Sequence, residues 1–311
     1  MEKPDATYKT PATDFVTLSD GARIGLQRWG TARPERMVVS HGNGLAVDGF
    51  REFGRKLADK YEVIAFDMRN HGHSGPGPLS EEPWPRFVAD IPEIFDHIQR
   101  LYGDKPTHGA FHSLSSVSTL FSQALTPRDW RTLTLYEPPV PPIMNPVLLD
   151  EFLKLHAKLA ARTRNRRRRF KSPDELKASF LRSPTFAGIP DETLSRLAIG
   201  AVFLAHPGDA APWQLVCDPE QEARTYEMRN IQRFCEAVGE VTSPVQVVIG
   251  GIGSHDMPIL INSCTALAET FGFPIQQIEQ GNHLLQLQWP GETAAIACDF
   301  AEAGQLDTRV Q

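Results

Sequence analysis

The chain has 311 residues, which is long for one domain but usual for an α/β domain that contains an insertion. Hydrophobic residues make up 41% and charged residues 23% of the sequence, and this balance excludes a disordered or fibrous protein. The net charge of -6 argues against a general nucleic-acid-binding protein.

The first half of the sequence alternates predicted strands with predicted helices. Residues 15–28 alternate apolar and polar side chains around Asp20 and Gly21, as expected for a hairpin. Short buried strands are predicted at residues 37–40, 62–67, 108–112 and 131–137, and helices at residues 50–59, 87–101 and 114–125. This order predicts an α/β fold with a mostly parallel sheet flanked by helices.

The alternation stops at residues 139–239, which contain many prolines, favour helices and show no clear strand. It resumes with predicted strands at residues 245–249 and 274–278 and predicted helices at residues 259–271 and 291–303. We therefore expect a core formed by residues 1–138 and 240–311, and a helical lid formed by residues 139–239.

The four cysteines and the N-terminus bear on the compartment. Cys217, Cys235, Cys264 and Cys298 are scattered and show no paired spacing, so they predict neither a zinc site nor a disulfide framework. The chain begins without an apolar signal segment, and no apolar run approaches the length that crosses a bilayer. The sequence thus predicts a soluble, intracellular, cytoplasmic protein without a membrane span.

Ser113 is the candidate nucleophile because it follows a predicted buried strand and precedes a predicted helix. A serine hydroxyl attacks a carbonyl at neutral pH when a sharp turn exposes it to a histidine base. The usual turn is G-x-S-x-G, but residues 111–115 have the sequence FHSLS, with bulky Phe111 and small Ser115 in place of the glycines. An alternative is that Ser113 only caps an ordinary helix.

Three further loops support the first interpretation. Residues 41–44 have the sequence HGNG, residues 67–74 have DMRNHGHS, and residues 280–283 have QGNH, each directly after a predicted strand or close to its end. With the order of the elements, these motifs resemble the α/β-hydrolase fold over nearly the whole chain. The resemblance implies a serine hydrolase that uses neither a metal nor another cofactor.

The resemblance also implies roles for individual residues. His283 would be the base, and the backbone N–H groups of Asn43 and Leu114 would form the oxyanion hole. His112, beside the nucleophile, would have a packing role. His71 and His73 have the spacing of a metal pair, but no third ligand is spaced with them and the adjacent glycines indicate a structural turn.

The orienting acid has two candidates. The usual family frame G-x-x-D-x-x-x-P fits residues 251–258, but Ser254 occupies the acid position and Asp256 comes two residues later. A second family arrangement places the carboxylate after the strand before the lid, where Glu137 stands. We favour Glu137 and keep Asp256 as the alternative; the simpler interpretations are a solvated carboxylate at a strand end and a helix N-cap, respectively.

Residues 135–139 (LYEPP) and 213–223 also resemble a narrower branch that includes yeast peroxisomal lipase-like proteins and fungal toxin-biosynthesis hydrolases. Large apolar side chains in the lid predict that it covers an apolar pocket, and these are Phe152, Phe180, Phe186, Phe203, Trp213 and Tyr226. We expect Gly42 and Trp213 to contact the substrate. The basic residues 162–171 could attract an acidic substrate, a nucleotide tail or a membrane surface, but a solvated face is the simpler interpretation.

Together these observations predict a serine hydrolase that cleaves small to medium carboxylic esters, thioesters or lactones, with an apolar part, through an acyl-enzyme on Ser113. The departures at Phe111 and Ser115 favour the main alternative, a non-catalytic small-molecule binding module. A carbon–carbon bond hydrolase, or cofactor-free oxygen chemistry, would use the same motifs, because the fold does not decide the function. The sequence predicts no oligomeric state.

Overall fold

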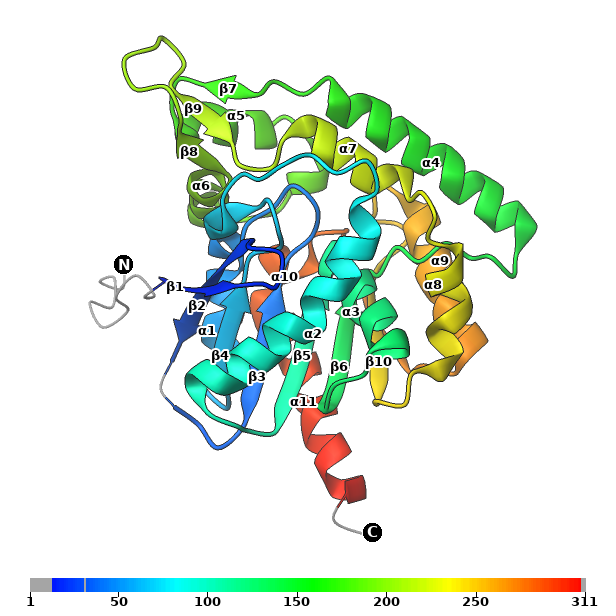
Figure 1. Cartoon of the computed structure of the whole chain (residues 1–311). Coiled ribbons are helices and arrows are strands. Elements are labelled where there is room, and N and C mark those ends of the chain that lie inside the picture. Colours follow the sequence, from blue (N-terminus) through cyan, green and yellow to red (C-terminus); the bar gives the residue numbers. More distant parts are fainter. Residues whose placement is uncertain (1–12, 31, 309–311) are drawn as a thin grey trace.

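The computed structural model describes residues 13–30 and 32–308 and contains an eight-stranded sheet with strand order β1-β2-β4-β3-β5-β6-β10-β11 (Figure 1). The strands are β1 (Thr13–Thr17), β2 (Arg23–Trp29), β3 (Arg36–Ser40), β4 (Glu62–Phe66), β5 (Thr107–His112), β6 (Trp130–Tyr136), β10 (Val245–Gly250) and β11 (Ile275–Ile278). β2 pairs antiparallel with β1 and β4, and the strands from β4 to β11 pair in parallel. The predicted hairpin and the mostly parallel α/β sheet are confirmed.

Helices cover both faces of this sheet because the central strands are apolar on both sides. In β3, Val38 belongs to one apolar core, while Met37 and Val39 belong to the other. The first core includes residues of α2 (Pro83–Tyr102), α3 (Leu114–Leu125) and α9 (Pro258–Phe271). The second includes residues of η1 (Val47–Phe50), α1 (Arg51–Leu57), α10 (Leu285–Gln288) and α11 (Pro290–Thr308).

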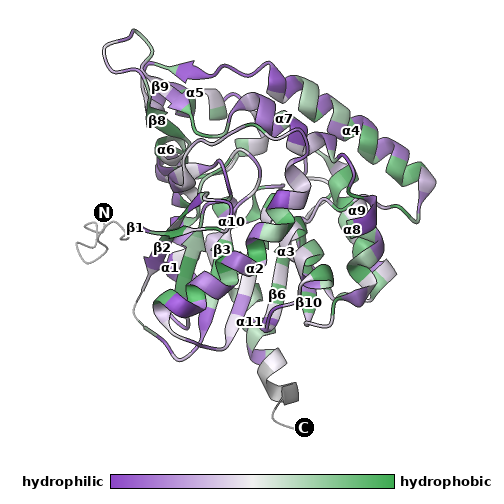
Figure 2. Cartoon of the chain, in the orientation of Figure 1, coloured by the Kyte–Doolittle hydropathy of each residue, from purple (hydrophilic) through white to green (hydrophobic). Residues whose placement is uncertain are grey.

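Most of residues 139–239 lie beyond one end of the sheet, where Figure 1 shows α4 running alongside α7. This segment contains α4 (Pro146–Arg164), β7 (Arg169–Phe170), α5 (Pro173–Phe180), η3 (Pro184–Phe186), α6 (Asp191–Gly200), β8 (Val202–Leu204), β9 (Trp213–Leu215), α7 (Pro219–Glu227), α8 (Gln232–Ala237) and η4 (Val238–Glu240). Figure 2 shows hydrophilic and hydrophobic residues interspersed along α4, as expected for a helix with one face on protein and one in solvent.

Two features of this segment differ from the prediction. β7, β9 and β8 form a small antiparallel sheet, so the expectation of a segment without strands is wrong. These strands have two or three residues each, too few for an alternating pattern to show in the sequence. In addition, Phe234 and Cys235 of α8 belong to the core beside α3, so the end of the predicted lid packs on the main sheet layer.

Most predicted elements of the core appear within a few residues of their expected bounds. α3 begins and ends at the predicted residues, and η2 (Gly72–Ser74) forms the tight turn after β4. α2 begins earlier than predicted, because Pro83 can start a helix at a position where no backbone N–H is needed. No helix in the described part of the chain is long and apolar enough to cross a membrane.

Phe111, the bulky residue before the candidate nucleophile, is accommodated by a glycine two residues earlier. Its ring is fully buried, with centroids 5.5 Å from the Trp130 ring and 6.2 Å from the Phe66 ring. Gly109 precedes it on the same side of β5, and a Cβ there would lie 2.4 Å from Phe111 Cε2. The missing side chain at Gly109 therefore provides the space that the phenyl ring occupies.

We predict that Gly109→Ala lowers the free energy of unfolding by roughly 1–3 kcal/mol, because the new methyl group displaces the Phe111 ring. Gly291→Ala is the control, since nothing lies within 4 Å of a Cβ at that position in α11; we expect it to leave the free energy of unfolding unchanged or to raise it by up to about 1 kcal/mol. Urea unfolding measures both. Equal effects of the two substitutions would contradict this explanation.

Candidate active site

Ser113 lies in a strained turn between β5 and α3. Its φ of 50° is in the left-handed region, which a side chain other than glycine rarely adopts, and its N–H donates to Tyr136 O at 2.9 Å. Its side chain makes no capping hydrogen bond to α3, so the interpretation of Ser113 as an ordinary helix cap is wrong. The turn holds the hydroxyl away from the helix and at the wall of a cavity.

Ser115 stabilises this turn with its hydroxyl group. Ser115 Oγ accepts a hydrogen bond from His112 N–H and donates one to the His112 carbonyl, both at 3.0 Å. The side chain is fully buried. The serine that replaces the usual glycine thus ties the first turn of α3 to the end of β5.

His283 lies between Ser113 and a carboxylate. His283 Nε2 is 3.2 Å from Ser113 Oγ, and His283 Nδ1 is 3.0 Å from Glu137 Oε2. Ser113 follows β5, Glu137 follows β6 and His283 follows β11, so the three groups come from the carboxyl ends of strands in one sheet. Of the residues that the sequence singled out, these three are brought together in the order that a nucleophile, a base and an orienting acid require.

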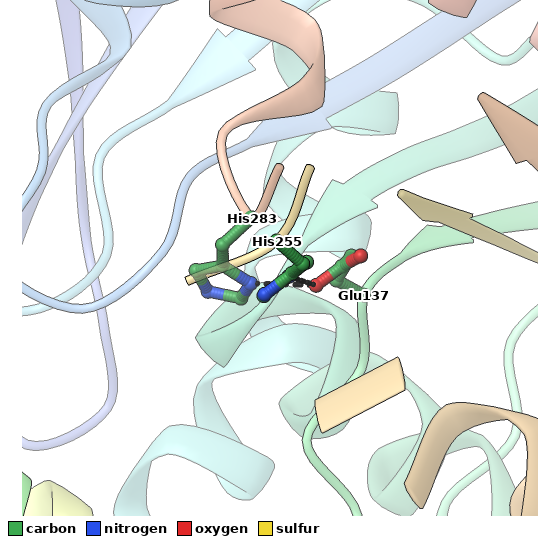
Figure 3. Close-up of side chains that lie close together, drawn as sticks. All are labelled: Glu137, His255 and His283. Carbon is green, nitrogen blue, oxygen red and sulfur yellow. Dashed lines mark hydrogen bonds and ion pairs between the residues drawn. The ribbon is translucent and has the colours of Figure 1, made fainter. Parts of the chain in front are cut away.

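The Glu137 carboxylate has no exposure to solvent and receives three hydrogen bonds. Gly250 N–H donates to Oε1 at 2.7 Å, while His255 Nε2 and His283 Nδ1 lie 2.7 and 3.0 Å from Oε2 (Figure 3). Burial alone would raise the pKa of the Glu137 carboxyl, but the hydrogen bonds from the two histidines hold it well below its usual range. Glu137 is therefore ionised in the folded protein.

Asp256 lies outside this arrangement. Its Oδ2 accepts a hydrogen bond from Thr185 Oγ1 at 2.5 Å, and its nearest histidine contact joins Oδ1 to His255 Nδ1 at 3.8 Å. It is not the N-cap of α9 either, because Met257 holds that position. Of the two carboxylates proposed from the sequence, Glu137 is the one within hydrogen-bond distance of His283.

His255 is a site residue that the sequence analysis missed. Its side chain is fully buried, and its Nδ1 accepts a hydrogen bond from Met257 N–H at 2.8 Å. This contact leaves the proton on Nε2, which donates it to Glu137. A lone histidine in a turn gives no sequence signal for such a contact; only its place beside Asp256 in the family's usual acid loop draws attention to it.

Glu137, His255 and His283 also have the residue types of a metal site, with one ligand atom from each lying within 4.8 Å of the others. The spacing between them fits hydrogen bonds, because Glu137 Oε2 lies 2.7 and 3.0 Å from the two ring nitrogens. A metal would need a free lone pair on His255 Nε2, whereas the Met257 contact leaves the proton on that nitrogen. The donor set thus fits a hydrogen-bonded cluster better than a metal site.

The backbone N–H groups of Asn43 and Leu114 have no hydrogen-bond acceptor among the residues described, and Asn43 lines the cavity that Ser113 also lines. The Asn43 side chain donates to Glu222 O at 2.9 Å and so joins this loop to α7. His71 supports the same loop, because its Nε2 accepts from Gly44 N–H at 3.0 Å. Burial lowers the pKa of His71 to about 3, which keeps the ring neutral and able to accept.

His112 and His73 have separate structural contacts. His112 Nε2 donates to His283 O at 2.7 Å, which joins the end of β5 to the loop of the candidate base. Burial lowers the pKa of His112 to about 3, so the ring stays neutral. His73 Nε2 lies 2.8 Å from Asp48 Oδ2, whereas His71 contacts backbone groups, so the two histidines do not share a set of ligands.

Ser113 and His283 open into a cavity of about 690 Å³ between the sheet and residues 139–239. Gly42 lines this cavity, so its contact with a substrate stays a prediction, whereas Trp213 does not line it and lies in the small antiparallel sheet of residues 139–239. Among the other large lid residues, Phe180, Phe186 and Tyr226 line it, whereas Phe152 and Phe203 do not. His156 of α4 also lines the cavity, and its buried Nε2 has no hydrogen-bond partner in the described part of the chain.

The sequence profile of the Alpha/beta hydrolase family matches residues 37–296. The chain belongs to this family. The predicted α/β-hydrolase fold is therefore confirmed. Part of the chain is also similar to the "Putative non-heme haloperoxidase" of Mycobacterium phage D29, which is 36% identical over 63 residues. These residues span 20% of this chain and 22% of that protein.

Solved structures resemble this α/β-hydrolase over most of its length. E-2-(acetamidomethylene)succinate hydrolase has a TM-score of 0.73 at 18% identity, covering 94% of this chain and all 100% of that one. The peroxisomal alpha-beta-hydrolase Lpx1 of Saccharomyces cerevisiae has a TM-score of 0.71 at 16% identity, and the match covers 97% of this chain and 86% of that one. The thioesterase domain from the curacin biosynthetic pathway has a TM-score of 0.69 at 17% identity, and the match covers 93% of this chain and 100% of that one. At these identities the likeness shows the fold alone.

We predict that Glu137→Gln changes how stability depends on pH. Because the folded-state pKa of Glu137 is depressed, its ionisation contributes stability that is fully present above the ordinary pKa of 4.5 and is lost as pH falls towards the folded-state value. Each pH unit below that ordinary value removes about 1.4 kcal/mol. Between pH 7 and pH 3, the free energy of unfolding of the wild-type protein should thus fall by about 2 kcal/mol more than that of the variant. Urea unfolding at the two pH values measures this difference.

Glu302→Gln is the control for this measurement, because Glu302 is exposed and pairs with Lys60 at the surface. The free energy of unfolding of Glu302→Gln should stay within about 0.5 kcal/mol of the wild-type value at both pH values. If Glu137→Gln and the wild type had the same pH dependence, the Glu137 carboxyl would not be ionised in the folded protein.

Proposed function

We propose that this α/β-hydrolase is a serine hydrolase that cleaves carboxylic esters, thioesters or lactones through an acyl-enzyme on Ser113. The observation that supports it most strongly is the position of His283, which is 3.2 Å from Ser113 Oγ and 3.0 Å from Glu137 Oε2 at the wall of the cavity. A nucleophile, a base and an ionised acid in this order are the groups that acyl transfer requires.

In the proposed reaction, His283 Nδ1–H donates to Glu137, which leaves the lone pair of Nε2 directed at Ser113 Oγ. Ser113 Oγ attacks the carbonyl carbon and gives its proton to His283, and the buried carboxylate stabilises the imidazolium that forms. The carbonyl oxygen becomes an oxyanion, which the backbone N–H groups of Asn43 and Leu114 stabilise.

The tetrahedral intermediate then collapses, and His283 returns the proton to the leaving alcohol or thiol. A water molecule attacks the resulting acyl-enzyme with His283 again as base, which releases the carboxylic acid and restores the Ser113 hydroxyl. His255 and Gly250 would act only through Glu137, by holding its carboxylate in the orientation that His283 needs.

We further propose that residues 139–239 act as a lid over this site. The cavity walls that they contribute contain apolar side chains, among them Leu155, Leu159, Phe170, Phe180 and Phe186. Such walls favour substrates with an apolar acyl or alcohol part. The four cysteines are buried and unpaired, which supports our expectation that the protein acts in a reducing, intracellular compartment.

Hydrolysis is favoured over a binding module without catalysis because the two departures from the usual turn have structural compensations. Gly109 provides the space for Phe111, and the Ser115 hydroxyl bonds to the His112 backbone. Neither change displaces Ser113 from His283. No feature of the cavity favours carbon–carbon bond hydrolysis over ester hydrolysis.

We predict that Ser113→Ala lowers the turnover of p-nitrophenyl esters by several orders of magnitude. Glu137→Gln should lower it by roughly a thousandfold or more, because the amide no longer stabilises the imidazolium or selects the correct tautomer. Asp256→Asn is the matched control at the other candidate acid, and its effect on kcat should stay within severalfold. Circular dichroism verifies the fold of each variant.

Wild-type turnover in the folded Ser113→Ala variant would refute the proposed nucleophile. A large loss in Asp256→Asn together with an unaffected Glu137→Gln would instead reverse the assignment of the acid.

A further inference from the structure

Five basic side chains line the cavity that contains Ser113, and these are Lys158, Arg162, Arg166, Arg167 and Arg182. Two of them are neutralised by carboxylates that line the same cavity. Arg166 pairs with Glu222 at 2.5 Å and Arg167 pairs with Glu175 at 2.8 Å. The other three cations, Lys158, Arg162 and Arg182, have no such carboxylate partner in the part of the chain that the structure describes.

Lys158 and Arg162 are one turn apart on α4, and Arg182 follows α5. None of the three forms an ion pair with any residue that the structure describes. Arg182 donates one hydrogen bond to the Ala178 carbonyl at 2.8 Å. Asp256, the third carboxylate lining the cavity, bonds instead with Thr185.

The other arginines of the basic run show that the lid does not lack carboxylates. Arg164 pairs with Glu220 and Glu227, Arg168 with Asp218, and Arg169 with Asp209. The run therefore consists mostly of arginines that hold the lid segments together. Arg162, its first member, differs from them because it lines the cavity and has no acidic partner among the residues described.

All three residues are exposed, and unpaired cations at the wall of a concave site attract anions in a way that added salt weakens. Lysine and arginine side chains bind carboxylates through charge-assisted hydrogen bonds. The three cations come from residues 139–239, whereas Gly42, Asn43, His112 and His283 line the cavity beside Ser113 from loops of the core. A substrate whose scissile carbonyl lies at Ser113 would thus extend between apolar lid side chains towards the cations.

We propose that the substrate is an ester or thioester whose acyl group ends in a carboxylate, bound by Lys158, Arg162 and Arg182. This inference rests on the proposed serine hydrolase function and adds a charge requirement to the purely apolar substrate expected from the sequence. The apolar walls then contact the chain between the two carbonyl groups.

The test compares p-nitrophenyl half-esters of adipic, suberic and sebacic acid with matching esters in which the distal carboxylate is a primary amide. Since exposed ion pairs contribute a factor of about two to five each, we expect kcat/KM to favour the carboxylate by roughly tenfold or more at the chain length that fits. Added NaCl should reduce this preference, because it screens the cations.

The double variant Lys158→Gln/Arg162→Gln should bring the carboxylate-to-amide ratio close to one, and Arg182→Gln should lower it in part. Lys154→Gln is the matched control, since Lys154 is likewise an exposed lysine of α4 but pairs with Asp150 and does not line the cavity. It should leave the ratio unchanged. A ratio of one or less at every chain length, or a ratio that the double variant does not alter, would overturn the proposal.

Binding to the Ser113→Ala variant, measured by calorimetry, separates this inference from the proposed function. A carboxylate preference in binding, without hydrolysis by the wild-type protein, would reject the hydrolase and keep the anion site. Hydrolysis of both esters at equal rates, with equal binding, would reject only the anion site.

Discussion

The buried carboxylate of Glu137 is the group on which the arrangement of the site depends. A carboxylate without solvent is costly unless other donors replace the lost water. Gly250, His255 and His283 supply these donors: Gly250 ends β10, His255 follows β10 and His283 follows β11. One negative charge thus joins the segments at the carboxyl ends of three adjacent strands, and it also determines which nitrogen of His283 faces Ser113.

Much of the fold could be predicted because it follows from local patterns. Apolar strands that end in glycine loops and helices with apolar periodicity mark the core, and α3 has its predicted bounds. The choice between Glu137 and Asp256 depends on which carboxylate lies within hydrogen-bond distance of His283. The two groups follow different strands, so the sequence alone does not give the distance between them. The sequence likewise did not predict that Gly109 makes room for Phe111, because Gly109 lies outside the motif of residues 111–115.

In residues 139–239, neither the short strands nor the ion pairs could be predicted from the sequence. These strands have no period that a sequence can display, and a run of arginines does not reveal which of them meets a carboxylate. α4 ends at Arg164 and the chain then turns into β7, so neighbouring arginines point to different partners. Arg166 reaches Glu222 of α7, whereas Arg162 lines the cavity. Residues 139–239 therefore combine ion pairs between their own segments with exposed cations that have no ion-pair partner in the described part of the chain.

The central claim is that Ser113 is the nucleophile and that the Asn43 and Leu114 N–H groups receive the oxyanion. A crystal structure of the protein after reaction with an alkyl fluorophosphonate tests it most directly. The account predicts a bond from phosphorus to Ser113 Oγ, with the phosphoryl oxygen within about 2.7–3.1 Å of the Asn43 and Leu114 nitrogens. An adduct on another residue, or a phosphoryl oxygen directed away from both N–H groups, would contradict it.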